Sequence, residues 1–174
     1  MSNKILYLLL PLLMFSSCGE ETPKLEDTKK EQKELVKEET PTIRPRELNN
    51  RLTLAQNNVH QSLLRFWDGE TDSLRRVYFK DFQFELEIQQ SNVNEITPTR
   101  KYGREFYTSI QNYFEFLKNS ESEFNQFIKL SNSEEETKQL DQLVNKITSQ
   151  YNVYLDSISH YQELFTSSNK VLLN

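Results

Sequence analysis

The sequence predicts an all-α protein: an antiparallel four-helix bundle with a long, heptad-like C-terminal helix, preceded by a disordered, charged linker. Three observations lead to this prediction. Apolar residues recur every three or four positions through most of residues 47–174. Short groups of turn-forming residues separate these periodic stretches, which favours antiparallel neighbours. Residues 19–46 lack the periodicity, and 15 of their 28 positions are charged.

The first helix is expected over residues 47–67. Its apolar stripe consists of Leu48, Leu52, Ala55, Val59, Leu63 and Phe66. Spacings of three and four place these side chains on one helix face. Asp68-Gly69 predicts the end of this helix, because glycine readily takes the left-handed conformation that closes many helices. Thr71 or Asp72 is expected to cap the next helix.

Residues 73–96 fit two patterns. Five apolar residues match one helix face: Leu74, Val77, Tyr78, Phe82 and Leu86. The alternation of Phe82, Phe84, Leu86 and Ile88 also matches a half-buried strand. A single strand would lack a partner, since no other segment alternates in this way. We therefore predict a helix.

The third helix is expected after Thr97-Pro98, because proline favours the first turn of a helix. Its apolar face comprises Tyr102, Phe106, Ile110, Tyr113, Leu117, Phe124 and Ile128. Whether the helix bends within residues 119–122 is left open by the sequence. Ser133 with the acids at 134–136 predicts a capping box for the last helix.

The last helix shows the clearest pattern of the chain. Its seam comprises Leu140, Leu143, Ile147, Tyr151, Tyr154, Ile158, Tyr161 and Phe165. Alternating steps of three and four residues approach a heptad repeat, which is typical of long helix-on-helix packing. At 1.5 Å per residue the seam would extend over about 40 Å.

The N-terminus combines three features of a cleaved export signal. Lys4 supplies a positive charge, residues 5–15 form an apolar stretch of 11 residues, and Ser16-Ser17 precede the only cysteine, Cys18. The stretch is too short for an ordinary membrane-spanning helix, which needs roughly 20 apolar residues. We expect a signal peptide at 1–17, a linker at 18–46 and a helical domain at 47–174.

Phe15-Ser16-Ser17-Cys18 resembles the lipobox of bacterial lipoproteins, with phenylalanine in place of the usual leucine. The resemblance covers only about the first 18 residues. It implies that Cys18 carries a diacylglyceryl group and becomes the first residue of the mature chain. The alternative is an ordinary secretory signal that ends near a cysteine. Two or three acyl chains would anchor the protein stably to a bacterial outer membrane.

Charge argues against two kinds of partner. Without the signal peptide, the chain has 20 basic and 26 acidic side chains, and no compact basic block. Nucleic acids and anionic lipid headgroups both favour clustered positive charge. We therefore expect no nucleic-acid binding, and membrane attachment through lipid alone.

No pattern indicates an enzyme, a metal site or a cofactor. His60 and His160 lie far apart in the sequence, and only Asp156 shares a helix face with His160 at ligand spacing. Three glycines are too few for a phosphate-binding loop, and none belongs to a known motif. The acidic residues fit solvated helix faces better than an acid–base pair. We expect no catalytic residues and no small-molecule substrate.

Aromatic residues are the remaining candidates for function. The chain has 11 Phe, eight Tyr and one Trp, and most fall at core-like positions. Tyrosine and tryptophan often anchor protein interfaces, although core packing is the simpler interpretation. The candidate partner-binding residues are Trp67, Tyr107, Tyr113, Tyr154 and Tyr161.

Together, these observations predict a non-enzymatic outer-membrane lipoprotein that binds or scaffolds another envelope protein, for example as an accessory of a secretion or motility complex. A contiguous exposed apolar seam on the third or fourth helix would favour this interpretation. The alternative is a surface-exposed lipoprotein that binds a ligand or a host protein. The sequence leaves open whether the domain faces the periplasm or the cell exterior.

Overall fold

The structure, a computed structural model, describes residues 43–131 and 137–171. All regular structure within these ranges is α-helical, which confirms the predicted all-α class. The helices are α1 (Pro45–Trp67), α2 (Asp72–Asn94), α3 (Gly103–Asn119), α4 (Glu121–Leu130) and α5 (Thr137–Asn169). The predictions for the signal peptide, Cys18, the linker up to residue 42 and the capping residue Ser133 lie outside the described residues.

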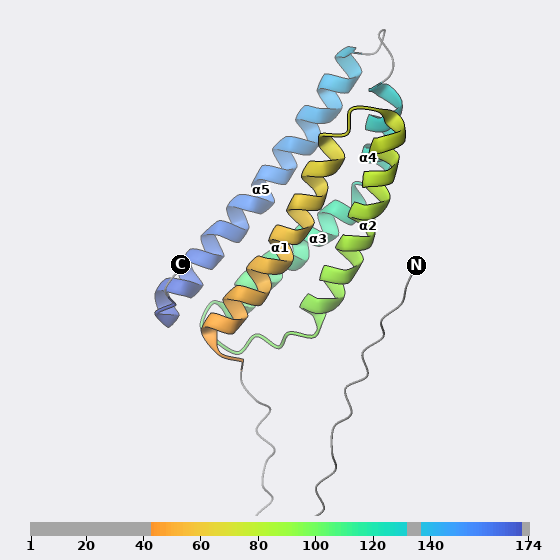
Figure 1. The fold of residues 1–174 in the computed structure, drawn as a ribbon. Helices are drawn as coiled ribbons and strands as arrows, with labels where there is room; N and C mark the ends of the chain where they lie inside the picture. The colour runs from red at the N-terminus through yellow and green to blue at the C-terminus, as the bar shows by residue number, and fades with distance from the viewer. Residues whose placement is uncertain (1–42, 132–136, 172–174) are drawn as a thin grey trace, which may run out of the picture. The chain divides into compact units, whose positions relative to one another are not determined.

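The helices pack side by side around one apolar core (Figure 1). α1 and α2 form an antiparallel pair joined by a short loop, and α3 and α4 lie behind them against α5. α2 also contacts α3 and α4, whereas the backbones of α2 and α5 do not approach each other. The outer side of α2 is thus left uncovered by the described helices.

α1 confirms its predicted apolar stripe. All six residues of that stripe are buried, with Leu48, Leu52, Val59 and Phe66 fully so. The helix begins at Pro45, two residues before the expected start. Pro45 had been assigned to the linker, but its fixed φ and missing N–H suit the first position of a helix.

Gly69 serves a different purpose from the one predicted. No glycine in the described residues has a positive φ, so Gly69 is not a left-handed cap. It is instead buried, and a Cβ placed there would lie 2.7 Å from Cγ of Arg75. Glycine is required by the close approach of Arg75, which also donates a hydrogen bond to the Ser131 hydroxyl at 2.9 Å.

The segment 73–96 is helical, as predicted. Thr71 caps α2, because its side chain accepts a hydrogen bond from the backbone N–H of Leu74 at 3.3 Å. The strand-like alternation arises because α2 is apolar on two faces. Phe82 and Leu86 are buried, whereas Phe84 and Ile88 are exposed. At 100° per residue, positions two apart fall on well-separated parts of a helix surface.

The third predicted helix is divided into two in the structure. α3 begins at Gly103, so Pro98 does not start the helix as predicted. The preceding Tyr102 is left-handed, with a φ of 57°, and turns the chain into α3. Ser120 ends α3, and α4 starts immediately after it. The bend that the sequence left open is therefore present, and the part of the chain that the structure describes has five helices where four were expected.

α5 confirms the predicted C-terminal seam. The buried members are Leu143, Ile147, Ile158 and Phe165, and the half-buried members are Leu140, Tyr151, Tyr154 and Tyr161. The seam packs mainly on α3 and α4, which together run along one side of α5. A long helix thus holds the two shorter helices in line.

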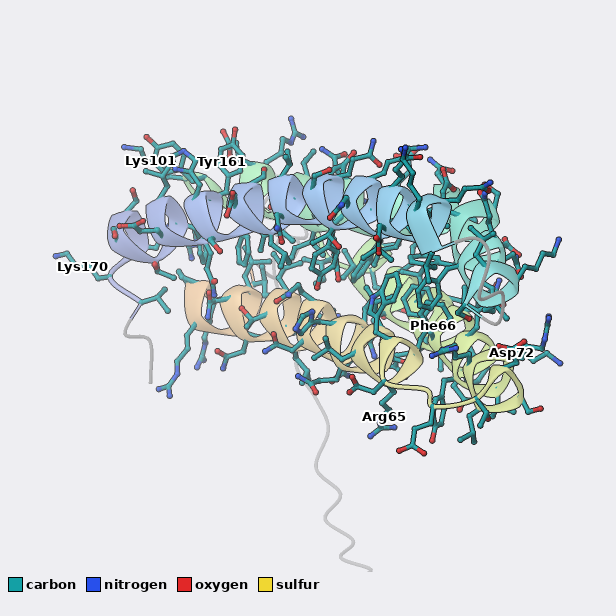
Figure 2. The ribbon with its side chains drawn as sticks, turned by 90° about the horizontal axis from the view of Figure 1, so that it is seen from above. Arg65, Phe66, Asp72, Lys101, Tyr161 and Lys170 are labelled. Carbon is teal, nitrogen blue, oxygen red and sulfur yellow. The ribbon has the colours of Figure 1, made fainter. Side chains whose placement is uncertain are left out.

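Phe66 lies at the centre of an aromatic cluster that joins three helices. Its ring centroid is 5.4 Å from that of Phe79 on α2 and 5.5 Å and 5.6 Å from those of Phe124 and Phe127 on α4. In Figure 2, Phe66 lies among the interior side chains, whereas the neighbouring Arg65 points outward. Edge-to-face and tilted ring pairs such as these stabilise the packing beyond their buried area.

Candidate functional site

An apolar stripe runs along the outer face of α2. It consists of Leu74, Val77, Phe84 and Ile88, whose exposed fractions are 41%, 52%, 66% and 37%. We call these four residues the outer stripe. The described residues contain only three other exposed large hydrophobic side chains, and these are spread over α1 and α5. The outer stripe is therefore the main concentration of exposed apolar surface.

The spacing of the outer stripe is that of a helix-packing seam. Steps of three, seven and four residues separate its members, and the exposed Asp81 occupies the remaining position of the repeat. This arrangement is the 3–4 pattern with which a helix presents one side to another helix. The buried side chains of α2 lie on a different face, so the core does not require the outer stripe.

Charged side chains flank the outer stripe. Arg76 and Lys80 are exposed on the N-terminal half of α2, and Glu87 is exposed on the C-terminal half. Glu85, on the opposite flank, is half-buried and accepts a hydrogen bond from Gln89 at 2.8 Å. The charge on the flank that carries Lys80 and Glu87 thus changes from positive to negative along the helix.

A shallow groove lies between α1 and α2, next to the outer stripe. Its volume is about 470 Å³, and its lining residues are Asn58, Gln61, Ser62, Arg65, Asp81, Phe84 and Glu85. Phe84 belongs both to the groove and to the outer stripe, so the two features form one continuous surface. A smaller pocket of about 70 Å³ lies between α2 and the α3–α4 side. It has room for roughly two water molecules.

Tyr113, one of the predicted partner-binding residues, is fully buried. It stands in the core of α3, with its ring centroid 5.7 Å from that of Tyr151. The prediction that Tyr113 contacts a partner is therefore corrected, because the side chain has no exposed surface. A large aromatic residue at a core position of a helix simply fills the space between helices.

The other four predicted aromatic residues are half-buried and pack against the core. Trp67 lies against Phe127 with a centroid distance of 4.6 Å, and Tyr154 stacks on Phe116 at 4.7 Å. The Tyr107 hydroxyl accepts a hydrogen bond from Gln111 at 2.8 Å. Tyr161 lies on α5 (Figure 2). The structure does not gather these residues into one surface with the outer stripe.

Three polar side chains meet between α1, α3 and α5. His60 is half-buried, and its Nδ1 atom is hydrogen-bonded to the Tyr151 hydroxyl. The Tyr113 hydroxyl is buried and interacts with the Tyr151 hydroxyl, although it makes no hydrogen bond of normal geometry with the described residues. Burial raises the pKa of Tyr113 well above its ordinary value of 10.0 and also raises the pKa of Tyr151.

The described residues contain no group of three His, Cys, Asp or Glu side chains close enough to hold a metal ion. Asp156 and His160 are both exposed on α5. In residues 43–131 and 137–171, none of the helices is long and apolar enough to span a membrane.

Comparisons with protein-family models, curated proteins and solved structures found no match to this chain.

Sequence reasoning missed the outer stripe because it assigned Leu74 and Val77 to the core-facing side of the helix. A usable signal was present: Phe79, Phe82, Leu86 and Val93 also form an apolar face of α2, and this face is the buried one. A helix with two apolar faces has more apolar surface than one core contact can cover. The sequence analysis named the third or fourth helix as the place for an exposed apolar seam, whereas the structure has its exposed apolar line on α2.

Proposed function

We propose that this chain is a lipid-anchored lipoprotein of the bacterial outer membrane whose helical domain has no enzymatic activity and docks another envelope protein. The observation that supports docking is the outer stripe of α2. The lipobox-like segment ending at Cys18 supports the anchor. Together they describe a protein that is held at the membrane surface and presents one helix to a partner.

The outer stripe favours a protein partner over a small molecule. Its four side chains form a line rather than a concave pocket, and ligand sites are usually concave. A partner helix placed along this line would remove the exposed apolar surface from water. Full burial of a large apolar side chain contributes about 1.5–3 kcal/mol, so half-exposed residues such as these would each contribute about 1 kcal/mol.

We also propose that the domain is a variant of the antiparallel four-helix bundle. In this interpretation α3 and α4 form a single bent arm, with Ser120 at the bend. The Ser120 hydroxyl donates a hydrogen bond to the Phe116 carbonyl at 2.9 Å, which stabilises the turn between the two helices. The arm packs along α5, while α1 and α2 form the other pair.

The anchor is tested by replacing the cysteine. We expect wild-type cells to incorporate labelled fatty acid into the protein, and the Cys18→Ala variant to incorporate none, because the chain has no other thiol. The variant should also leave the membrane fraction. An unlabelled wild-type protein would show that residues 1–17 are an ordinary secretory signal.

Docking is tested by comparing two equally exposed positions. Phe84 on α2 and Val153 on α5 each expose 66% of their surface. We expect Phe84→Glu to abolish recovery of the partner in a pull-down from detergent-solubilised membranes, and Val153→Glu to leave it unchanged. Both variants should fold as the wild type does, because surface substitutions usually change stability by about 0.5 kcal/mol or less. Equal loss in both variants, or no specific partner at all, would refute docking through α2.

A further inference from the structure

The outer stripe and its flanking charges point to one particular occupant. We infer that α2 pairs antiparallel with α2 of a second copy of this chain, so that the protein forms a symmetric dimer at the membrane surface. The inference rests on the proposed function, since it uses the same docking face, and it specifies that the envelope protein docked there is a second copy of this chain.

Seam spacing allows more than one antiparallel register, and we choose the one that sets Lys80 beside Glu87 of the second copy rather than beside its Lys80. In antiparallel helix pairs, the two seam positions of the repeat alternate across the interface. This places Val77 against Ile88 of the second copy and Phe84 against Asp81 of the second copy. The two-fold axis then passes between residues 82 and 83, near the middle of α2. Each side chain of the pair is matched twice, as a two-fold interface requires.

The charges favour this antiparallel register. Lys80 lies beside Glu87 of the second copy, and the symmetric contact repeats the pair. On the other flank, Tyr78 lies beside Glu85 of the second copy. A parallel pair would instead bring the two Asp81 carboxylates face to face in one layer of the seam. Like charges directly opposite each other are destabilising, whereas a single polar seam residue in an antiparallel pair helps to fix the register.

The size of the seam explains why membrane anchoring matters for this dimer. From Leu74 to Ile88 the outer stripe extends over about 21 Å at 1.5 Å per residue. The seam offers only four apolar residues per copy, whereas a standard stable interface involves roughly 20–30 residues of all kinds on each side. The dimer is therefore weak when free in solution. Confinement to one surface raises the effective concentration of the two copies and favours pairing.

The test uses the intact lipidated protein in lipid vesicles, labelled through a new cysteine at the exposed Gln150 on α5. Donor- and acceptor-labelled wild-type copies should show energy transfer above the level of randomly distributed proteins. Lys80→Glu alone and Glu87→Lys alone should each weaken association about tenfold, because two opposite-charge pairs become like-charge pairs. An equal mixture of these two variants should restore the transfer, since every pair then joins opposite charges.

Glu85→Lys distinguishes the two orientations of the pair. In the antiparallel dimer Glu85 lies beside Tyr78 and no opposite-charge pair is lost, so its reversal should lower energy transfer less than Lys80→Glu does. In a parallel pair Glu85 would lie near Lys80, and the same reversal would abolish the transfer. The inference would be overturned if energy transfer in the wild type stayed at the level of randomly distributed proteins, or if mixing the two variants did not restore it. If pull-down of another protein still depends on Phe84, the proposed docking function survives that outcome.

Discussion

Replacing Phe66 by alanine is expected to cause the largest loss of stability of any substitution considered in this protein. Phe66 is fully buried and its ring contacts rings on both α2 and α4. Loss of a buried phenylalanine side chain costs about 3–5 kcal/mol, because the transfer energy is lost and a cavity remains. A typical domain has only about 5–15 kcal/mol of net stability. Urea unfolding followed by circular dichroism should therefore show a much lower midpoint.

The exposed Phe84 provides the control for this experiment. Phe84→Ala makes the same chemical change where 66% of the side chain is exposed, so we expect a change of about 0.5 kcal/mol or less. Phe66→Leu should fall between the two, because it leaves a smaller cavity. If Phe66→Ala were no more destabilising than Phe84→Ala, the aromatic cluster would not hold α1, α2 and α4 together.

The helices with one apolar face could be predicted well from the sequence. The stripe of α1 and the seam of α5 both repeat at three and four residues, and every member is buried or half-buried. A single face leaves only one way to turn the helix toward the core. α2 was identified as a helix for another reason: a lone strand would have had no partner.

Positions that depend on tertiary contacts could not be predicted. Glycine at 69 suggested a left-handed cap, but the structure shows that the nearby Arg75 side chain excludes a Cβ there. Pro98 suggested a helix start, but the chain continues to a left-handed Tyr102 before α3 begins. Both residues are consistent with several local structures, and at Gly69 the side chain of Arg75, one helical turn into α2, decides which one forms.

The candidate site could likewise be predicted only in part, because a sequence pattern indicates a helix but not which of its faces is exposed. The sequence indicated that the residues of the outer stripe are apolar and helical, but not that Leu74 and Val77 face outward. Aromatic residue type was also a weak guide, because Tyr113 is fully buried and the more exposed Phe84 was not singled out. Exposure depends on which face of a helix its neighbours cover, and that is a property of the whole fold.

The second large effect is expected at Tyr113, where removal of a single oxygen should stabilise the protein. The Tyr113 hydroxyl is buried and interacts with the Tyr151 hydroxyl, but it makes no hydrogen bond of normal geometry with the described residues. A fully unpaired buried hydroxyl costs about 1–3 kcal/mol, and a poorly aligned interaction recovers only part of that cost. Tyr113→Phe keeps the ring and its packing while removing this cost. We expect the free energy of unfolding to rise by about 1 kcal/mol or less at neutral pH.

The difference between the wild type and Tyr113→Phe should grow in alkaline solution. Burial raises the pKa of Tyr113 in the folded state, whereas in the unfolded chain the group titrates near its ordinary value of 10.0. Below pH 10 both states hold the proton, so this group adds no pH dependence. Above it, only the unfolded state releases the proton, and the wild type loses about 1.4 kcal/mol per pH unit. Urea unfolding at neutral pH and above pH 10 should reveal a steeper slope in the wild type than in the variant, in which Tyr151 still has a raised pKa.

Tyr154→Phe separates the buried hydroxyl from a general effect of losing a tyrosine. Tyr154 is half-buried and stacks on Phe116, so its ring packing resembles that of Tyr113 while its hydroxyl is not among the buried atoms without a partner. We expect its replacement to change stability at neutral pH by about 0.5 kcal/mol or less. A loss of stability in Tyr113→Phe at neutral pH would contradict the argument. It would mean that the hydroxyl makes a favourable interaction in the folded protein, because the phenylalanine ring preserves every apolar contact.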